Sequence, residues 1–145
     1  MRVGFAVNKS GTSPILFNDL LVFFSSTPMV LQPSETKKVQ TGVHLRIETG
    51  YVLNIITDKD LYEKGVSIFP GTLALNSSFS GELLIPLHNI VRNQINLPEK
   101  TQIAWGYVIK VEPISFEAMS LEEPAKKKDR SKPVKKHTDI KFEIK

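Results

Sequence analysis

The chain contains no cysteine. This absence excludes a disulfide framework, a thiol nucleophile and any metal site built from cysteine ligands. Long hydrophobic runs are also missing, since no apolar stretch approaches the roughly 20 residues that a helix needs to cross a bilayer. The first residues lack a basic start followed by a long apolar stretch, which is the pattern of a signal peptide. We therefore expect a soluble, cytoplasmic protein with no membrane partner.

Motifs that would identify an enzyme directly are absent as well. The sequence has no glycine-rich phosphate-binding loop, no serine nucleophile with a nearby base and no histidine spacing typical of zinc. His44 and His88 stand alone in strand-like segments, so each is predicted to be a hydrogen-bonded or surface histidine rather than a metal ligand. We assign no residue as a metal ligand.

Charge is distributed unevenly between the body of the chain and its tail. Residues 1–121 contain ten Lys and Arg and ten Asp and Glu, whereas residues 122–145 contain nine and five. The net charge of +4 is thus a property of the tail. A neutral body gives no support to a basic nucleic-acid-binding surface on the fold. The 145 residues, 41% of them hydrophobic, suffice for one domain followed by a tail.

The body carries short, frequent strand signals. They are separated roughly every 8–12 residues by turn-forming pairs such as Thr41-Gly42, a spacing typical of a sandwich or barrel. Strands are predicted at 1–7, 19–25, 29–31, 38–40, 43–47, 51–56, 66–69, 72–75, 81–87, 102–111 and 140–144. One short helical turn is predicted at 58–64. Pro86 lies inside a strong strand and cannot donate to a ladder, so that strand is predicted to be an edge strand or to carry a bulge.

The segment from 71 to 89 is the most informative of the chain. An apolar strand containing Leu73 and Leu75 leads into small polar residues, then Phe79, then a second apolar strand. This pattern predicts a β-hairpin whose turn could lay backbone groups against a flat ligand.

The end of the chain has a different composition. Residues 122–136 are highly charged and almost without apolar side chains, which predicts a flexible linker. Residues 137–145 follow, in which Ile140, Phe142 and Ile144 alternate with charged residues as in a half-buried strand. We expect this strand to pair with a distant edge, either in the same chain or in a neighbouring subunit.

Five fragments in a fixed order carry a family resemblance. They are Asn18-Asp19-Leu20, Pro33-Ser34-Glu35 with Thr41-Gly42-Val43, Leu61 with Lys64-Gly65-Val66, residues 75–82 with Asn89, and Gln102-Ile103-Ala104-Trp105. In turn they resemble Gly-Tyr-Asp-Leu, Pro-Gly-Glu with Thr-Gly-Ile, Arg-Ser-Gly-Leu-Ala with Gly-Ile, Ile-Asp-Ser-Asp-Tyr-Arg-Gly-Glu, and Arg-Ile-Ala-Gln of the trimeric dUTPase (deoxyuridine triphosphate nucleotidohydrolase) family. The resemblance implies a jelly-roll-like all-β domain over residues 1–121 and a homotrimer.

The departures from this pattern fall on the catalytic groups. The family's hairpin aspartate, which orients the attacking water, is Asn76 here, and an amide cannot serve as a general base. The phosphate-binding Arg-Ser pair falls at about Asp58-Lys59, where a carboxylate would repel a triphosphate. The glutamine of the last motif is Trp105, and the glycine-rich C-terminal arm has no counterpart. No catalytic residue and no cofactor is therefore assigned.

What survives is a candidate ligand site in the hairpin. Its residues are Asn76, Ser77, Ser78, Phe79 and Gly81. Phe79 takes the place of the family's tyrosine, which stacks on the deoxyribose. Two alternatives stay open, since Phe79 could instead pack on its neighbours and Asn76 could be an ordinary turn residue.

Other polar residues have two interpretations each. Lys59 and Lys64 could contact a phosphate or a partner, but the segment of Asp58, Lys59, Asp60, Glu63 and Lys64 is better explained as a solvated turn with i,i+4 pairs. Asp19 resembles a first-motif aspartate that could hold a metal through water, and otherwise begins a strand. Trp105 is predicted to lie in the core or at a subunit interface rather than to stack on a ligand.

Three functions remain open. The first is a non-catalytic dUTPase-like protein, suited to a viral or phage setting in a host cytoplasm, that binds a nucleotide-like ligand or a protein partner in the inter-subunit pocket. The second is a divergent nucleotide pyrophosphohydrolase, with Mg²⁺, that uses acids such as Asp58, Asp60 and Glu82. The third is a trimeric assembly protein whose basic tail contacts nucleic acid.

The third interpretation makes a prediction of its own. Because phosphate contacts by Lys and Arg displace counterions, DNA binding through the tail should fall steeply between 50 and 200 mM salt and vanish on truncation after Met119. Fluorescence anisotropy with a labelled duplex measures both effects. Binding that survives truncation would contradict a nucleic-acid role for the tail.

Overall fold

The structure, a computed structural model, describes residues 3–121. The chain divides into two compact units, Met1–Glu112 and Pro113–Lys145, and every helix and strand below belongs to the first. In the second unit, residues 113–121 form no helix or strand and are exposed. The predicted linker at 122–136 and the predicted strand at 137–145 lie outside the described residues. No helix within residues 3–121 is long and apolar enough to cross a membrane.

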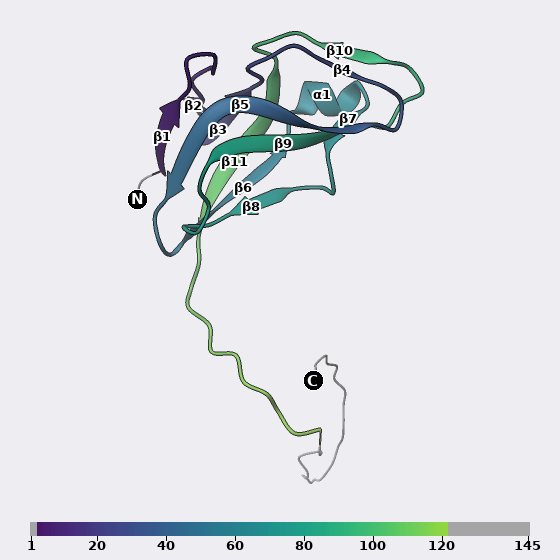
Figure 1. Ribbon diagram of the computed structural model, residues 1–145. Coiled ribbons are helices and arrows are strands. Elements are labelled where there is room, and N and C mark those ends of the chain that lie inside the picture. Colours follow the sequence, from purple (N-terminus) through teal and green to yellow (C-terminus); the bar gives the residue numbers. More distant parts are fainter. Residues whose placement is uncertain (1–2, 122–145) are drawn as a thin grey trace. The chain divides into compact units, whose positions relative to one another are not determined.

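The first unit consists of two main antiparallel sheets, a two-stranded ribbon and one short helix (Figure 1). The four-stranded sheet has the order β1 (Val3–Val7), β5 (Thr36–Ile47), β9 (Glu82–Asn89), β7 (Val66–Ile68). The five-stranded sheet has the order β2 (Ile15–Phe17), β3 (Leu20–Phe24), β11 (Gln102–Lys110), β6 (Tyr51–Thr57), β8 (Leu73–Leu75). The ribbon pairs β4 (Met29–Leu31) with β10 (Ile95–Leu97), and the helix is α1 (Lys59–Glu63).

One hydrophobic core joins the two main sheets. Phe23, Leu53 and Ile55 of the five-stranded sheet share a cluster with Val39 and Ile85 of the four-stranded sheet, and all five are fully buried. Side chains alternate between the two faces of a strand, so each sheet buries every second residue. The predicted all-β fold is therefore confirmed.

The largest difference from the predicted strands lies in β5. The pair Thr41-Gly42 was predicted to be a turn between two strands, but the structure has one strand with a bulge, where the register shifts between Gln40 and His44. Thr41 Oγ1 donates to the carbonyl of Leu83 at 2.7 Å, and Gly42 has a φ of 71°. Turn-forming residues thus bend a continuous strand here, which a period-2 pattern does not distinguish from a loop.

Two strands of three residues each were not predicted. They are β2 and β10. β2 forms a hairpin with β3 through Asn18 and Asp19, whose φ values of 50° and 65° fit the two-residue loops that match strand twist. Asp19 is therefore a turn residue. The prediction that it begins the strand is wrong, since β3 starts at Leu20.

The prediction for Pro86 was wrong. β9 lies between β5 and β7, so it is not an edge strand, and the bulge lies in the neighbouring β5. The proline carbonyl accepts a hydrogen bond from the backbone N of Phe69 at 3.0 Å, one residue after β7 ends. In an antiparallel strand, the N and the C=O of one residue point toward the same neighbouring strand. The nitrogen of Pro86 therefore points toward the chain just after the end of β7. No ladder donor is missing there.

The bulge generates a test of stability. A Cβ on Gly42 would lie 2.4 Å from the Cα of Gly11, whereas one on Gly50, at a φ of 92°, would meet nothing within 4 Å. Gly50→Ala should lower the free energy of unfolding by about 1–2 kcal/mol through left-handed strain alone. Gly42→Ala should lower it by a further ~1–3 kcal/mol, because backbone cannot yield as a side chain can. Urea unfolding followed by circular dichroism measures the difference, and equal losses would contradict this role of Gly42.

Candidate functional site

The segment 71–89, which was predicted to be a hairpin, is not one. β8 pairs with β6 in the five-stranded sheet, whereas β9 pairs with β5 and β7 in the four-stranded sheet. The residues between them therefore cross from one sheet to the other (Figure 1). Apolar strands on both sides of a polar turn suit a sandwich corner as well as a hairpin, and only the pairing distinguishes the two.

The crossing segment holds its own shape through Asn76. The side-chain oxygen Oδ1 accepts hydrogen bonds from the backbone N of Ser78 at 2.9 Å and from its Oγ at 2.6 Å. The backbone N of Phe79 donates to the carbonyl of Asn76 at 3.0 Å. Asn76 therefore acts as a turn residue of the kind that bonds its own backbone two residues on.

The other residues of the segment differ in exposure. Ser77 and Ser78 are exposed, whereas Phe79 is half-buried and packs against the core. Phe79 thus packs on its neighbours, which was one of the two alternatives, although part of its ring remains accessible to solvent. Gly81 has a φ of 96° and open space around it, so its backbone conformation and not crowding calls for glycine.

The helix was predicted at the right place, but Asp58 has a different role from the one expected. Asp58 is only 4% exposed and caps α1, since its Oδ2 accepts a hydrogen bond from the backbone N of Leu61 at 3.1 Å. The prediction of a solvated turn with i,i+4 pairs is therefore wrong for Asp58. Lys59, the first residue of α1, and Lys64, its C-cap, are exposed at the two ends of the helix. Within residues 3–121, the one ion pair closer than 4.0 Å joins Lys37 and Glu35, not residues of α1.

The remaining oxygen of Asp58 joins α1 to β11. Its Oδ1 accepts hydrogen bonds from Nε2 of Gln102 at 2.7 Å and from Nε1 of Trp105 at 2.8 Å. The backbone N of Asp58 also donates to the carbonyl of Ile103 at 3.0 Å. Two residues at which the chain departs from the family pattern, Asp58 and Trp105, thus bind each other. No local pattern in the sequence indicated this contact, because 47 residues separate Asp58 from Trp105.

Within one chain, the crossing segment with Asn76 and Phe79 lies away from Lys59 and Lys64 at α1. Leu75 pairs with Leu53 near the start of β6, whereas α1 begins just after the end of that strand. Six residues of extended chain separate Leu53 from Lys59, which corresponds to about 20 Å. Figure 1 shows the crossing from β8 to β9 and the helix α1 at opposite ends of β6. The exposed lysines therefore do not face Asn76 or Phe79 of the same chain.

The acids considered for hydrolysis are also kept apart. Asp58 is engaged in its three side-chain hydrogen bonds, and Glu82 accepts one from the backbone N of Gly42 at 2.9 Å. Asp60 is exposed in α1. Within residues 3–121, no three His, Asp or Glu side chains lie close enough together to hold a metal ion.

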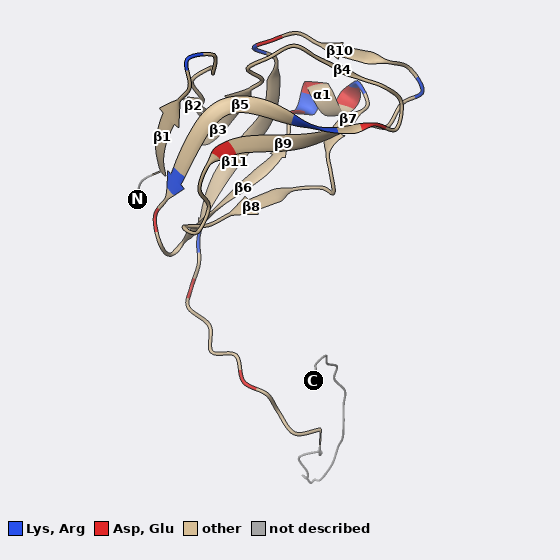
Figure 2. Cartoon of the chain, in the orientation of Figure 1, with Lys and Arg blue, Asp and Glu red and all other residues tan. Residues whose placement is uncertain are grey.

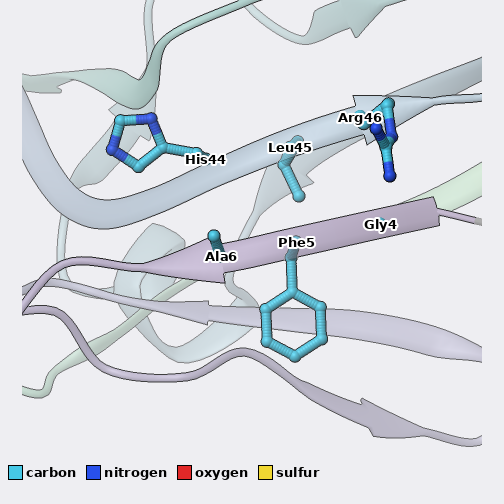
Figure 3. A pocket seen from close by; sticks show the side chains of 6 residues that line it. All are labelled: Gly4, Phe5, Ala6, His44, Leu45 and Arg46. Carbon is cyan, nitrogen blue, oxygen red and sulfur yellow. The ribbon is translucent and has the colours of Figure 1, made fainter.

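His44 and His88 both have hydrogen-bond partners, as predicted. His44 Nε2 lies 2.9 Å from Asn8 Oδ1, and His88 Nδ1 lies 2.7 Å from Thr36 Oγ1. His44 also lines a shallow pocket of about 270 Å³ between β1 and β5 (Figure 3). The other lining residues are Gly4, Phe5, Ala6, Leu45 and Arg46. None of the residues predicted to bind a ligand lies in this pocket.

Comparison with known proteins yields relatives of one kind. The chain is 30% identical over 93 residues to the deoxyuridine 5'-triphosphate nucleotidohydrolase of Orientia tsutsugamushi strain Ikeda, and 29% identical to that of strain Boryong. The match spans 63% of this chain and 63% of each relative. No protein-family model matches the chain.

Solved structures agree on the fold. The dUTPase of Staphylococcus bacteriophage 80alpha superposes with a TM-score of 0.77 at 15% identity, over 85% of this chain and 99% of that one. A mutant dUTPase of Staphylococcus aureus phage phi11, described with a structural Mg(II) ion, gives 0.76 at 15% identity, over 86% and 100%. The chain thus has a dUTPase-like fold, as the order of its motifs indicated.

The contact between Asp58 and Trp105 can be tested by a double-mutant cycle. Trp105→Phe removes one of two donors to a buried carboxylate oxygen and should lower the free energy of unfolding by about 1.5–3 kcal/mol. In an Asp58→Ala background the same change should cost at least ~0.5 kcal/mol less, since the partner is gone. Asn76→Ala, at the far end of β6, serves as the control background and should leave the effect of Trp105→Phe unchanged. Additive effects with Asp58→Ala would contradict the contact.

Proposed function

We propose that this dUTPase-like chain forms a non-hydrolysing homotrimer that binds a deoxynucleoside-like ligand between subunits without gripping a triphosphate. The observation that carries the proposal is the hydrogen bonding of Asp58 to Trp105 and Gln102. By the resemblance, Asp58 stands at the phosphate-binding arginine and Trp105 at a glutamine of the last motif. By the resemblance, a buried carboxylate thus occupies the place where a phosphate-binding arginine would be expected.

Electrostatics argue against a bound triphosphate at this place. Two unit charges 4 Å apart interact by about 4 kcal/mol at the effective dielectric near a protein surface, and here the carboxylate and the phosphate have the same sign. Both donors that could turn toward a phosphate, Nε1 of Trp105 and Nε2 of Gln102, already bind Asp58. Lys59 is exposed beside the cap but cannot restore a bidentate guanidinium clamp.

The hairpin position argues against hydrolysis. An amide at Asn76 cannot accept a proton from water, and its oxygen is used by the backbone and hydroxyl of Ser78. The exposed residues Ser77 and Ser78, with the accessible part of Phe79, offer backbone groups and an aromatic edge to a flat ligand. Because α1 lies at the other end of β6, a ligand that touches both elements needs a second copy of the chain. This supports an inter-subunit site and the trimer that the resemblance implies.

A second candidate is a protein partner at the same surface. The observation in its favour is that the crossing segment from Asn76 to Ser78 is exposed and held in one conformation by its own hydrogen bonds, as suits a rigid recognition loop. Phage dUTPases with a similar fold are described as controlling the transfer of virulence genes. For this chain, binding of a protein would need no phosphate site.

Calorimetry and an activity assay together test the proposal. We expect no release of pyrophosphate from dUTP or the four common deoxynucleoside triphosphates, with Mg²⁺ or Mn²⁺, above a protein-free control. Isothermal titration should show that deoxyuridine binds at least as tightly as dUTP, because the triphosphate gains no contact and meets Asp58. Ser77→Trp should abolish binding, whereas Glu99→Trp, in an exposed turn elsewhere, should leave it unchanged.

Each result has a clear opposite. Turnover of dUTP, or binding of dUTP at least tenfold tighter than that of deoxyuridine, would overturn the loss of the phosphate site. If neither compound binds, the nucleoside ligand is excluded and the protein-partner candidate stands alone.

A further inference from the structure

The outer face of the four-stranded sheet carries the polar side chains of its long strand. Val39 and Leu45 of β5 belong to the core, and successive residues of a strand alternate between its two faces. The residues of β5 on the outer face are therefore Thr36, Lys38, Gln40, His44 and Arg46. The positions of β9 that pair with this row hold Glu82, Leu84, Pro86 and His88. The row from Lys38 to Arg46 extends over roughly 25 Å of strand.

One end of this face presents a fixed aromatic ring. Phe69 is 54% exposed, and its ring centroid lies 5.7 Å from that of His88. The imidazole is held in turn, because Nδ1 of His88 lies 2.7 Å from Oγ1 of Thr36. The backbone N of Phe69 donates to the carbonyl of Pro86 at 3.0 Å, which keeps the residue beside β9. An exposed ring that is held in place on a sheet is a surface on which an unstacked base can stack.

The other end of the face is hollowed beside a guanidinium. Arg46 pairs with Gly4, and the next pair joins His44 to Ala6, so small residues of β1 lie opposite long side chains of β5. The shallow pocket of about 270 Å³ lies at these residues (Figure 3). A Cβ on Gly4 would lie 3.7 Å from Nε of Arg46, so the guanidinium lies close to the glycine. A planar guanidinium beside an open hollow can bind two oxygens of a phosphate at once.

The face carries two cations and one acid. Across the described residues 3–121, neither Lys38 nor Arg46 forms an ion pair closer than 4.0 Å. The acid, Glu82, directs one oxygen into the bulge, where it accepts a hydrogen bond from the backbone N of Gly42 at 2.9 Å. Figure 2 shows basic residues near both ends of β5. The neutral total charge of residues 1–121 therefore conceals two cations that are available to an anionic ligand.

We propose that the outer face of the four-stranded sheet binds single-stranded nucleic acid, with a base stacked on Phe69 and phosphates bound by Lys38 and Arg46. Sheet surfaces that bind single strands combine exposed aromatic rings with cations that follow the phosphate backbone. This face has a ring at one end and cations along the row that leads away from it. The body of the chain thus contains a nucleic-acid surface of its own, apart from the basic tail.

A single strand fits this face better than a duplex does. A base can stack on a protein ring only after it has left its own stack, and a duplex keeps its bases stacked inside. Because every base has a flat face, stacking on Phe69 should give little sequence preference. Residues 76–81 of the nucleoside-like site precede β9 and do not belong to the row, so the two proposals can fail separately.

Fluorescence anisotropy of a labelled oligothymidylate with the full chain tests this face. Phe69→Ser should weaken binding about tenfold, because a stacked base loses its ring. Arg46→Gln and Lys38→Gln should each reduce the slope of log K against log salt by ~0.7, the effect of one phosphate contact on a single strand. Two matched controls should change neither quantity. They are Tyr62→Ser, at an aromatic residue of α1 that is 60% exposed, and Lys110→Gln, at the end of β11 in the other sheet.

The tail is the same in all these variants, so binding through it contributes equally to each. Absence of binding by the wild-type chain would overturn the inference. Binding that none of the three variants of the face alters would also overturn it, since the tail then accounts for the affinity. Polyphosphate, an anion without bases, tests the stacking directly. Phe69→Ser should leave polyphosphate binding unchanged, and an equal loss for both ligands would contradict a stacked base.

A second variant keeps the test valid if circular dichroism shows that Phe69→Ser does not fold. Phe69→Trp retains an aromatic ring, so it should bind the oligothymidylate with nearly wild-type affinity. The fluorescence of the added indole should be quenched when a base stacks on it. Binding without any quenching beyond that of the wild-type chain would place the strand elsewhere and overturn the inference.

Discussion

The hydrogen bonds of Asp58 are the constraint on which the functional interpretation depends. One carboxylate caps α1 through Leu61 and binds Gln102 and Trp105 of β11. A buried carboxylate is tolerated only when hydrogen-bond donors surround it. Removing one donor leaves part of the negative charge without a partner in an apolar environment. The position therefore cannot change alone. An arginine at 58 would face two donors, and a side chain without a donor at 105 would leave the carboxylate with one partner fewer.

The core of the dUTPase-like fold is independent of this hydrogen-bonded set. It joins Phe23 and Leu53 to Val39 and Ile85 and contains none of Asp58, Gln102 and Trp105. Polar groups at a site can be exchanged as a set, provided that each buried member keeps a partner. Asp58, Gln102 and Trp105 form such a set. The fold alone consequently says little about activity, which has to be argued from the site.

The outer faces of the two main sheets differ in charge and in polarity. The four-stranded sheet exposes charged side chains such as Lys38 and Arg46, and water can cover it. The five-stranded sheet exposes Phe17 and Tyr107 beside Trp105 and has no charge on that face. The two outer faces of the sandwich therefore differ in the charge and polarity that they present to solvent.

The sequence by itself determined the fold class, most strands and the helix near 58–64, because these depend on local periodicity and on residue identity. It could not distinguish the bulge at Thr41-Gly42 from a turn, nor the crossing at 76–81 from a hairpin, since both use the same small polar residues. It also could not show that Asp58 is buried or that Trp105 binds it. Those facts depend on which strands become neighbours, and strand pairing across dozens of residues is decided only when the two sheets close on their common core.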